Sequence, residues 1–585
     1  MPDSRLVPTP ASSDLPTYTI MVDGEEINSA YRILSIIVTC ELSKIPQAEI
    51  TLLDGDVATE DFEVSNTDDL VPGKTIEIQA GYHGSNDTIF KGVIVKHAIR
   101  ILQAEASTLT ILAKHPAFIT TLTRKHKVFP EKKDSEAMED ILGTAGIAYE
   151  VESTDIQHES LVQYNATDWD FINMRAEANG KIVIPSGEKI IVKAPDLSAE
   201  PGLSLYYGSS ILEFEAELDA RKSFDNYIAA TWSAAEQELK TSEEPGSGVT
   251  SAQGNLSVSD LASSLSTGDF NVCIPASVTD QEATAMAKAI IVRNNLARIR
   301  GRVKCIGYAS LTPGDLINLN GVGERFNGHA FVSGISHSIA EGSWETDIQI
   351  GYSPVIYANQ YDDITACPAS GSLPAINGLH IATVIALEND PEGENRISIK
   401  LPHVTDCEST CWARVATLDA GKERGSFFLP EINDEVIVGF IDDDPRKAVV
   451  LGMVNSSKLP APQTAADANN IKGFYTRSKM KVEFDDDKKI ITIETPAGNT
   501  LVFSEEDSSI SLTDQNSNKI KMTTDGITVE SCKDISLKAG SGDVKIEGVN
   551  LSFKGSSTLK AEGAASAEIS SSAITKITGS MVQIN

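Results

Sequence analysis

The chain has 585 residues, of which 41% are hydrophobic and 23% charged, and its formal net charge is −34. This length provides for several domains with sizeable cores. So acidic a surface repels phosphate groups and anionic lipid headgroups, which argues against binding to nucleic acid or to membranes. No run of eighteen apolar residues predicts a transmembrane helix. The first residues lack the apolar core of a secretory signal, so we expect assembly in the cytoplasm.

The cysteines are odd in number and scattered, at Cys40, Cys273, Cys305, Cys367, Cys407, Cys411 and Cys532. This usage is typical of a reducing compartment and does not indicate a disulfide framework. His403, Cys407 and Cys411 form an H-x3-C-x3-C cluster. Because a structural metal site needs a fourth ligand, we predict no metal and no cofactor, while metal binding by this cluster stays an open alternative.

The N-terminal part of the chain is mainly β in pattern. Residues 1–16 are rich in Pro and Ser, which predicts a flexible arm. Alternation of apolar and polar residues then predicts strands in one small β-barrel or sheet. These strands are expected at residues 18–24, 33–39, 48–54, 75–82, 88–97 and 106–113.

Three helices are expected within this part. The first covers 135–143, the second runs from about 167 to 179, and the third covers 279–299. Thr279 and Glu282 have the spacing of a capping box at the start of the third helix. Strands are predicted at 181–184 and 189–192. The Ser-, Glu- and Gly-rich stretch 233–267 is typical of a long loop.

This part of the chain also contains a series of short motifs, namely Gly73 with Gly81-Tyr82 and Ile89-Phe-Lys-Gly92, Thr167-Asp-Trp-Asp-Phe171, Gly301-Arg302, Leu311-Thr-Pro-Gly314, Arg325-Phe-Asn-Gly328 and Trp344-Glu-Thr346. The series resembles the hub region of VgrG-type spike proteins, which are related to baseplate hub proteins of phages. The resemblance implies a hub over residues 17–355 with two barrel-like β-domains and a few inserted helices. It also implies that three chains form a ring with pseudo-sixfold symmetry.

A linker at 356–373 precedes an expected OB-fold domain at 374–460. Five short strands with Gly-containing turns predict a small barrel there. A motif in this domain resembles the OB domain of the same family, and its residues are Trp412, Arg414, Pro430, Glu431, Asp434, Glu435, Asp444 and Pro445. Asn433 stands where the family has Gly, and Asn tolerates a left-handed turn. The acidic loop at 442–444 argues against nucleic-acid binding, so we interpret the domain as an adaptor.

After a connector at 461–479, residues 480–585 repeat two apolar residues in alternation at intervals of about seven to ten positions. Each repeat is too short to form a second layer, so the apolar stripe needs neighbouring chains. We therefore predict an intertwined, triple-stranded β-helical needle, with an antiparallel β-sandwich as the alternative. The trimer-core positions are expected at Val482, Phe484, Ile491, Ile493, Leu501, Phe503, Ile510, Leu512, Ile527, Val529, Val544 and Ile546.

No catalytic motif accompanies this architecture. The sequence lacks a G-x-S-x-G elbow, a P-loop, an H-E-x-x-H motif and a dinucleotide fingerprint. We therefore expect no enzyme activity and no catalytic residues. Because no His follows His403, we do not expect the tip to bind iron as in some relatives. The residues Met581, Val582, Gln583, Ile584 and Asn585 are expected to bind a separate PAAR-like tip protein.

The resemblance implies the trimeric structural spike of a contractile injection system, which links an inner tube to a piercing tip and delivers cargo when a sheath contracts. The implied partners are an inner-tube or hub-adaptor protein and baseplate wedge proteins at the N-terminal end, the tip protein, and effector cargo. The sequence does not decide between three assemblies: an extracellular phage-tail-like particle, a cell-bound type VI apparatus and a phage tail. The alternative function is that of a trimeric β-helical adhesin or tail-fibre-like protein.

Overall fold

The computed structural model describes residues 15–103, 105–249, 251–274, 276, 278–403 and 410–584. The chain forms two compact units, residues 1–376 with 442–445 and residues 377–441 with 446–585, called the first and second units below. None of the described helices combines the length and the apolarity that crossing a bilayer would require.

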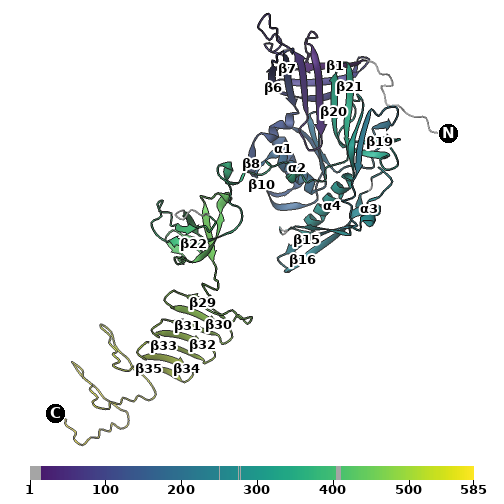
Figure 1. Ribbon diagram of the computed structural model, residues 1–585. Coiled ribbons are helices and arrows are strands. Elements are labelled where there is room, and N and C mark those ends of the chain that lie inside the picture. Colours follow the sequence, from purple (N-terminus) through teal and green to yellow (C-terminus); the bar gives the residue numbers. More distant parts are fainter. Residues whose placement is uncertain are drawn as a thin grey trace. The chain divides into compact units, whose positions relative to one another are not determined.

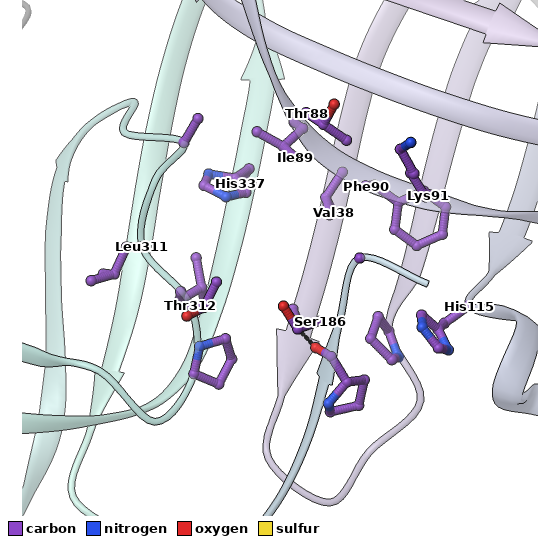
Figure 2. A pocket seen from close by; sticks show the side chains of 17 residues that line it. Val38, Thr88, Ile89, Phe90, Lys91, His115, Ser186, Leu311, Thr312 and His337 are labelled. Atoms are coloured by element: carbon purple, nitrogen blue, oxygen red, sulfur yellow. Dashed lines mark hydrogen bonds between the residues drawn. The ribbon is translucent and has the colours of Figure 1, made fainter. Parts of the chain in front are cut away.

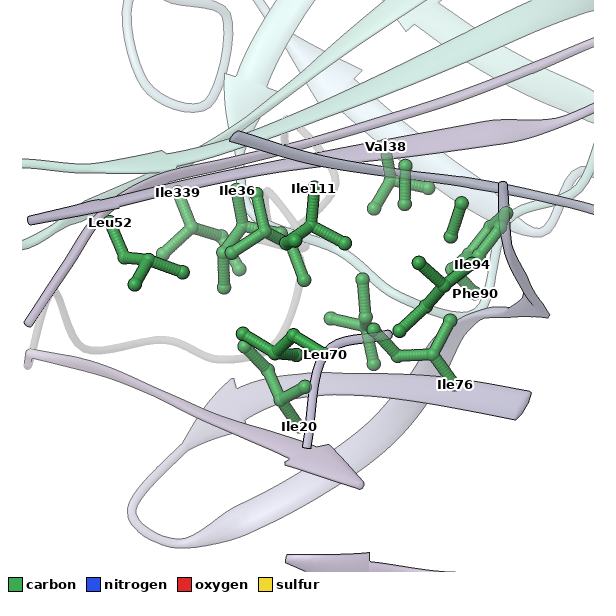
Figure 3. Packing of buried hydrophobic residues seen from close by; sticks show 14 of the residues in the cluster. Ile20, Ile36, Val38, Leu52, Leu70, Ile76, Phe90, Ile94, Ile111 and Ile339 are labelled. Atoms are coloured by element: carbon green, nitrogen blue, oxygen red, sulfur yellow. The ribbon is translucent and has the colours of Figure 1, made fainter. Parts of the chain in front are cut away.

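The first barrel-like region of the first unit encloses one hydrophobic cluster. Its strands are β1 (Pro16–Val22), β2 (Glu25–Glu26), β3 (Ile33–Glu41), β4 (Gln47–Leu53), β5 (Thr75–Tyr82), β6 (Ser85–Arg100) and β7 (Thr108–Lys114). Alternate residues point inward, so that Ile36 and Ile111 from one side meet Ile20 and Ile76 from the other (Figure 3). All six strands expected here from alternation are present.

A second barrel-like region encloses a separate cluster that includes Val303, Ile317 and Ile348. Its strands are β13 (Leu203–Tyr206), β14 (Glu213–Leu218), β18 (Ile299–Ile306), β19 (Leu316–Asn320), β20 (Gly328–Ala340) and β21 (Ser343–Ile350). Strand β20 pairs with β3, so both regions share one 13-stranded sheet with the main order β14-β18-β21-β20-β3-β4-β7-β6-β5-β1-β2. The two expected barrel-like domains are thus continuous through this pairing.

Two smaller layers are inserted into the sequence between these strands, one between β7 and β13 and one between β14 and β18 (Figure 1). The first consists of β8 (Arg124–Lys133), α1 (Asp134–Thr144), β9 (Ala148–Val151), β10 (Gln157–Thr167), α2 (Asp168–Ala178), β11 (Ile182–Ser186) and β12 (Lys189–Lys193). The second consists of β15 (Asn226–Ser233), β16 (Glu238–Pro245), α3 (Val258–Leu265), β17 (Asp269–Cys273) and α4 (Asp280–Leu296). The expected capping box is present, because Thr279 and Glu282 bond each other's backbone amides.

The prediction of a long loop at 233–267 is wrong. Strand β16 pairs with β15 over its whole length, and α3 begins at a capping box formed by Ser257 and Asp260. The polar composition misled the prediction because β16 is an exposed outer strand held by ladder hydrogen bonds, which need few apolar side chains.

The second unit begins with the expected OB barrel. Strands β22 (His380–Ala386), β23 (Ile397–Lys400), β24 (Cys411–Val415), β27 (Glu435–Phe440) and β28 (Ala448–Met453) close into a barrel. A small hairpin, β25 (Ala420–Gly421) with β26 (Arg424–Gly425), projects from it. The barrel core includes Val384, Ile399, Ala413, Val436 and Val450, all fully buried. The fold class is therefore mainly β with an OB barrel, as predicted.

The remainder of the second unit contains a seven-stranded antiparallel meander, called the terminal sheet below. Its strands are β29 (Ile471–Tyr475), β30 (Lys481–Asp485), β31 (Ile490–Glu494), β32 (Thr500–Ser504), β33 (Ser509–Thr513), β34 (Lys519–Thr523) and β35 (Gly526–Glu530). Strand β29 lies in the stretch that the sequence indicated as a connector. Residues 531–584 contain turns and bends but no strand within the single chain.

Candidate functional site: an apolar face of the terminal sheet

One face of the terminal sheet consists of two apolar rows that cross successive strands in register. The first row contains Phe474, Val482, Ile493, Leu501, Leu512, Ile520 and Val529. The second contains Phe484, Ile491, Phe503, Ile510, Met522 and Ile527. Directly opposed side chains on neighbouring strands contact each other. The alternation in the sequence thus becomes one continuous apolar surface.

The row between them points to the opposite face and is mostly polar. It contains Glu483, Thr492, Val502, Ser511, Lys521 and Thr528. On the same face, Lys481 of β30 forms an ion pair with Glu494 of β31 at 3.1 Å. A sheet with one polar and one apolar face is stable in water only when a second layer covers the apolar face.

Within the chain no such layer is present among the described residues of the terminal sheet. Phe503 is 41% exposed, Leu512 50% and Ile527 69%. Burying an aliphatic or aromatic side chain completely stabilises a protein by about 1.5–3 kcal/mol. The two rows are about half exposed, so burying them against a partner would stabilise the protein much further than the single chain does.

The predicted trimer-core residues of the terminal sheet all lie on this face. The ten positions from Val482 to Val529 belong to the two rows, and Phe474, Ile520 and Met522 extend them. Val544 and Ile546 lie beyond β35, where they are 54% and 53% exposed and belong to no strand. At the far end Met581 and Ile584 are 84% and 86% exposed, and Asn585 lies outside the described residues.

Residues of the predicted OB motif lie in β24, at the start of β27, and in the turns before β27 and β28. Asn433 has a φ of 75°, the left-handed conformation that the sequence predicted for it. The Glu431 amide donates to the Asp434 carboxylate at 2.8 Å, which fixes the turn before β27. Pro430 and Asp444 are buried, Trp412, Asp434, Glu435 and Pro445 are partly buried, and Arg414 and Glu431 are exposed.

Contacts between the barrel and the terminal sheet come from both motif and non-motif residues. Arg477 donates to the Glu431 carboxylate at 2.7 Å. Phe428 stacks on Phe474 with ring centroids 5.7 Å apart. Phe474 is also the first residue of an apolar row, so the barrel covers the beginning of the apolar face.

A cavity of about 280 Å³ lies in the first unit, between the first barrel-like region, the β11–β12 turn and the second barrel-like region (Figure 2). Its lining includes His115 and His337, which the sequence did not single out as a pair. Burial lowers the pKa of His337 to about 4, and its Nδ1 lies 3.0 Å from the Thr346 hydroxyl. Burial also lowers the pKa of His115 to about 4, although an interaction with the Gly187 backbone opposes the shift.

The cavity does not assemble reactive groups. Burial raises the pKa of the Cys40 thiol to about 12, so it is not a thiolate nucleophile near neutral pH. The Lys91 ammonium is paired with the Glu77 carboxylate at 3.2 Å. No group of three or more potential metal ligands occurs in the described part of the chain. Of the H-x3-C-x3-C cluster, Cys407 lies outside the described residues.

Two family models match this chain. A family model described as "Alg8 N-terminal domain" matches residues 12–341. A second model, described as "Type VI secretion system/phage-baseplate injector OB domain", matches residues 380–454. The first match covers most of the first unit, and the second coincides with the OB barrel.

Two curated relatives come from Pseudomonas aeruginosa. The type VI secretion system spike protein VgrG1b is 22% identical over 435 residues, which are 69% of this chain and 57% of the relative. The spike protein VgrG1c is 21% identical over 457 residues, which are 72% of this chain and 61% of the relative. The chain thus spans less than two thirds of the length of these relatives.

Solved structures give weaker similarities. An E. coli component of the type VI secretion system has a TM-score of 0.40 at 14% identity, covering 74% of this chain and 99% of that chain. A 43 kDa tail protein of a Shewanella oneidensis prophage has a TM-score of 0.43 at 10% identity, covering 58% of this chain and 98% of that chain. The chain is similar to VgrG-type spike proteins, and its OB barrel matches the injector OB-domain family. Because the first family model spans more than half of its residues, the chain belongs to the Alg8 N-terminal-domain family.

Proposed function

We propose that this chain is the structural spike of a contractile injection system and acts as a homotrimer. Three terminal sheets, related by a threefold axis, turn their apolar faces toward one another and form a three-sided prism. Each chain then supplies the second layer that the others lack. The spike connects an inner tube to a piercing tip and moves through an envelope when a sheath contracts.

The observation that carries the proposal is the exposed double row of apolar side chains on the terminal sheet. A soluble monomer rarely exposes so large a contiguous apolar surface. The rows are continuous across all of β30–β35, which is the geometry needed for a rigid shaft rather than for a local binding pocket.

Residues 531–584 extend the proposal. The apolar alternation continues there, for example at Ile535 and Leu537, yet these residues form no ladder within their own chain. Because strands need backbone partners, we assign those partners to the other two chains. In this proposal the shaft changes at about Ser531 from sheets made by single chains to strands wound between chains.

The mass in solution tests the proposal. We expect three times the 62.6 kDa chain mass. Replacing Leu501→Asp places a charge in the apolar row and should lower the trimer population at least tenfold. The matched control is Val502→Asp, on the same strand but the opposite face, and the trimer should survive it. A monomeric wild type, or equal loss in both variants, would contradict the proposal.

The expected partners belong to the proposal as well. The exposed Met581, Val582 and Ile584 support a PAAR-like tip protein at this end. An inner-tube or hub-adaptor protein and baseplate wedge proteins are proposed for the first unit, with effector cargo carried by the spike. Co-purification of a tip protein with wild type, but not with Met581→Asp/Ile584→Asp, is the expected result. Equal capture by Ile385→Asp, exposed on the OB barrel, serves as the control.

A further inference from the structure

The cavity of about 280 Å³ in the first unit has a lining whose charge differs from that of the chain as a whole. Asp and Glu make up 83 of the 585 residues, yet none of the 17 described residues that line the cavity is acidic. Of these lining residues, Lys91 alone is charged near neutral pH, because burial lowers the pKa of both His115 and His337 to about 4. The cavity wall therefore favours an anion over a cation.

One buried hydrogen-bond donor in this lining has no partner. His115 is 1% exposed, and its Nδ1 accepts the Ala117 amide at 3.1 Å, so the proton of the neutral ring is on Nε2. The Gly187 backbone is near enough to raise the pKa of His115, but no described group meets the geometry of a hydrogen bond with Nε2. Because a buried N–H without a partner is costly, this donor favours a ligand that brings an acceptor.

Lys91 has donors left for such a ligand. Its ammonium is paired with the Glu77 carboxylate at 3.2 Å. The same carboxylate also accepts the Thr88 hydroxyl at 2.6 Å and the Gln79 side-chain amide at 2.9 Å, so it does not depend on the lysine alone. An ammonium group has three N–H donors, and one ion pair leaves donors for a second anion.

Much of the remaining lining is apolar. Figure 2 shows His115 and Lys91 on one side of the cavity and Leu311 on the other. A group with two or more negative charges would lose its hydration beside a single lysine, which is unfavourable. The volume is that of roughly nine water molecules at about 30 Å³ each, so the ligand is small. The apolar lining includes Val38, Phe90, Leu311, Pro313 and Ile335.

We propose that this cavity binds a short-chain monocarboxylic acid as its anion. The carboxylate accepts the Nε2–H of His115 and an N–H of Lys91, and the hydrocarbon chain extends toward Leu311. A ligand with an amino group is disfavoured, because the lining offers no carboxylate to pair with it. The cavity lies between the two barrel-like regions, so the bound acid contacts both and stabilises their arrangement. The site is formed within one chain and does not depend on the proposed function.

Equilibrium dialysis of the full-length protein against radiolabelled hexanoate at pH 7 tests the proposal. We expect one saturable site per chain. Unlabelled hexanoate should displace the label at least tenfold more effectively than 1-hexanol, which has the same chain without the carboxylate, and hexylammonium should not displace it. Absence of saturable binding, or equal displacement by 1-hexanol, would overturn the proposal. Neither result would bear on the trimer, whose test is the mass in solution.

Variants of the lining place the site. His115→Phe keeps a ring but removes the donor, and Lys91→Met removes the charge, so each should weaken hexanoate binding about tenfold or more. His115→Gln supplies both an acceptor and a donor and should restore most of the affinity. Lys96→Met, at an exposed lysine of the same strand outside the lining, is the matched control and should bind normally.

A cavity-filling variant keeps the test decisive if His115→Phe does not fold. Ala309 lines the cavity and is partly buried, so Ala309→Leu should occupy part of its volume and abolish hexanoate binding. Unchanged binding in both Lys91→Met and Ala309→Leu would show that hexanoate binds elsewhere and would overturn the proposal.

Discussion

The first unit and the terminal sheet use the same apolar alternation with opposite results. In the first unit the sheet curves around Ile36, Leu52 and Ile111, which are at most 1% exposed (Figure 3). In the terminal sheet Ile491, Ile510 and Leu512 remain 39–50% exposed. The difference is the number of layers, because the described part of the chain places no second layer over the terminal sheet. A similar pattern therefore predicts a chain's own core in one region and a partner in the other.

The largest expected effect distinguishes a side chain buried within its own chain from one buried by assembly. Leu52→Ala in the fully buried cluster should lower the free energy of local unfolding by about 2–5 kcal/mol, because a cavity remains. This loss should not depend on protein concentration. Phe503→Ala in the terminal sheet should act mainly by weakening assembly, so its effect should grow on dilution. Hydrogen exchange at two concentrations measures both, and a dilution effect in Leu52→Ala would contradict the comparison.

The second-largest expected effect is a loss of stability at low pH, which should distinguish the first unit from the terminal sheet. His337 is buried and its pKa is lowered to about 4, whereas an unfolded histidine titrates near 6.5. As pH falls below 6.5 the unfolded chain binds a proton that the folded chain excludes, so stability is lost. At pH 5 this amounts to about 2 kcal/mol for His337 alone. The terminal sheet contains no histidine.

The measurement is hydrogen exchange or urea unfolding of the first unit between pH 7 and 5. His337→Asn should be less stable at pH 7 but should lose less stability on acidification. His380→Asn, at a partly exposed histidine of the OB barrel, is the control. An unchanged pH slope in His337→Asn would show that His337 is not the titrating group.

A smaller effect is expected at the cap of α4, which belongs to the first unit alone. Thr279 accepts the Glu282 amide through its hydroxyl at 3.2 Å. Thr279→Ala should lower the local stability of the helix by about 1 kcal/mol. Thr279→Ser keeps the hydroxyl and should lose much less. Faster exchange in the terminal sheet of Thr279→Ala would contradict the independence of the two regions.

The sequence predicted those elements whose information is local. The cap at Thr279, the left-handed Asn433 and the rows through Leu501 and Phe503 all follow from short patterns. It missed β8, which contains a proline and places only Phe129 fully in the core. That strand exists because β10 pairs with it.

Long-range pairing escaped prediction for the same reason. Strand β20 reaches β3 across nearly the whole first unit, as in the pair His337 and Val38, and no local pattern specifies that choice. The cavity near His115 depends on three segments that meet only after this pairing. In contrast, the apolar face of the terminal sheet needed no distant contact, so its residues were predictable although the chains that cover it were not.

The smallest effect concerns the junction of the OB barrel and the terminal sheet. The ion pair between Arg477 and Glu431 is short, at 2.7 Å, but the two side chains are 81% and 48% exposed. Water and salt screen such pairs, which contribute about 0–1 kcal/mol. Arg477→Ala should therefore change stability by less than about 1 kcal/mol, and the change should vanish at high salt. Phe428→Ala should cost more, because the stacked ring on Phe474 loses apolar contact as well. The contrary result would be a larger loss of stability at high salt in Arg477→Ala than in Phe428→Ala. The ion pair and not the stacked rings would then hold the junction, and the barrel would not cover the start of the apolar row.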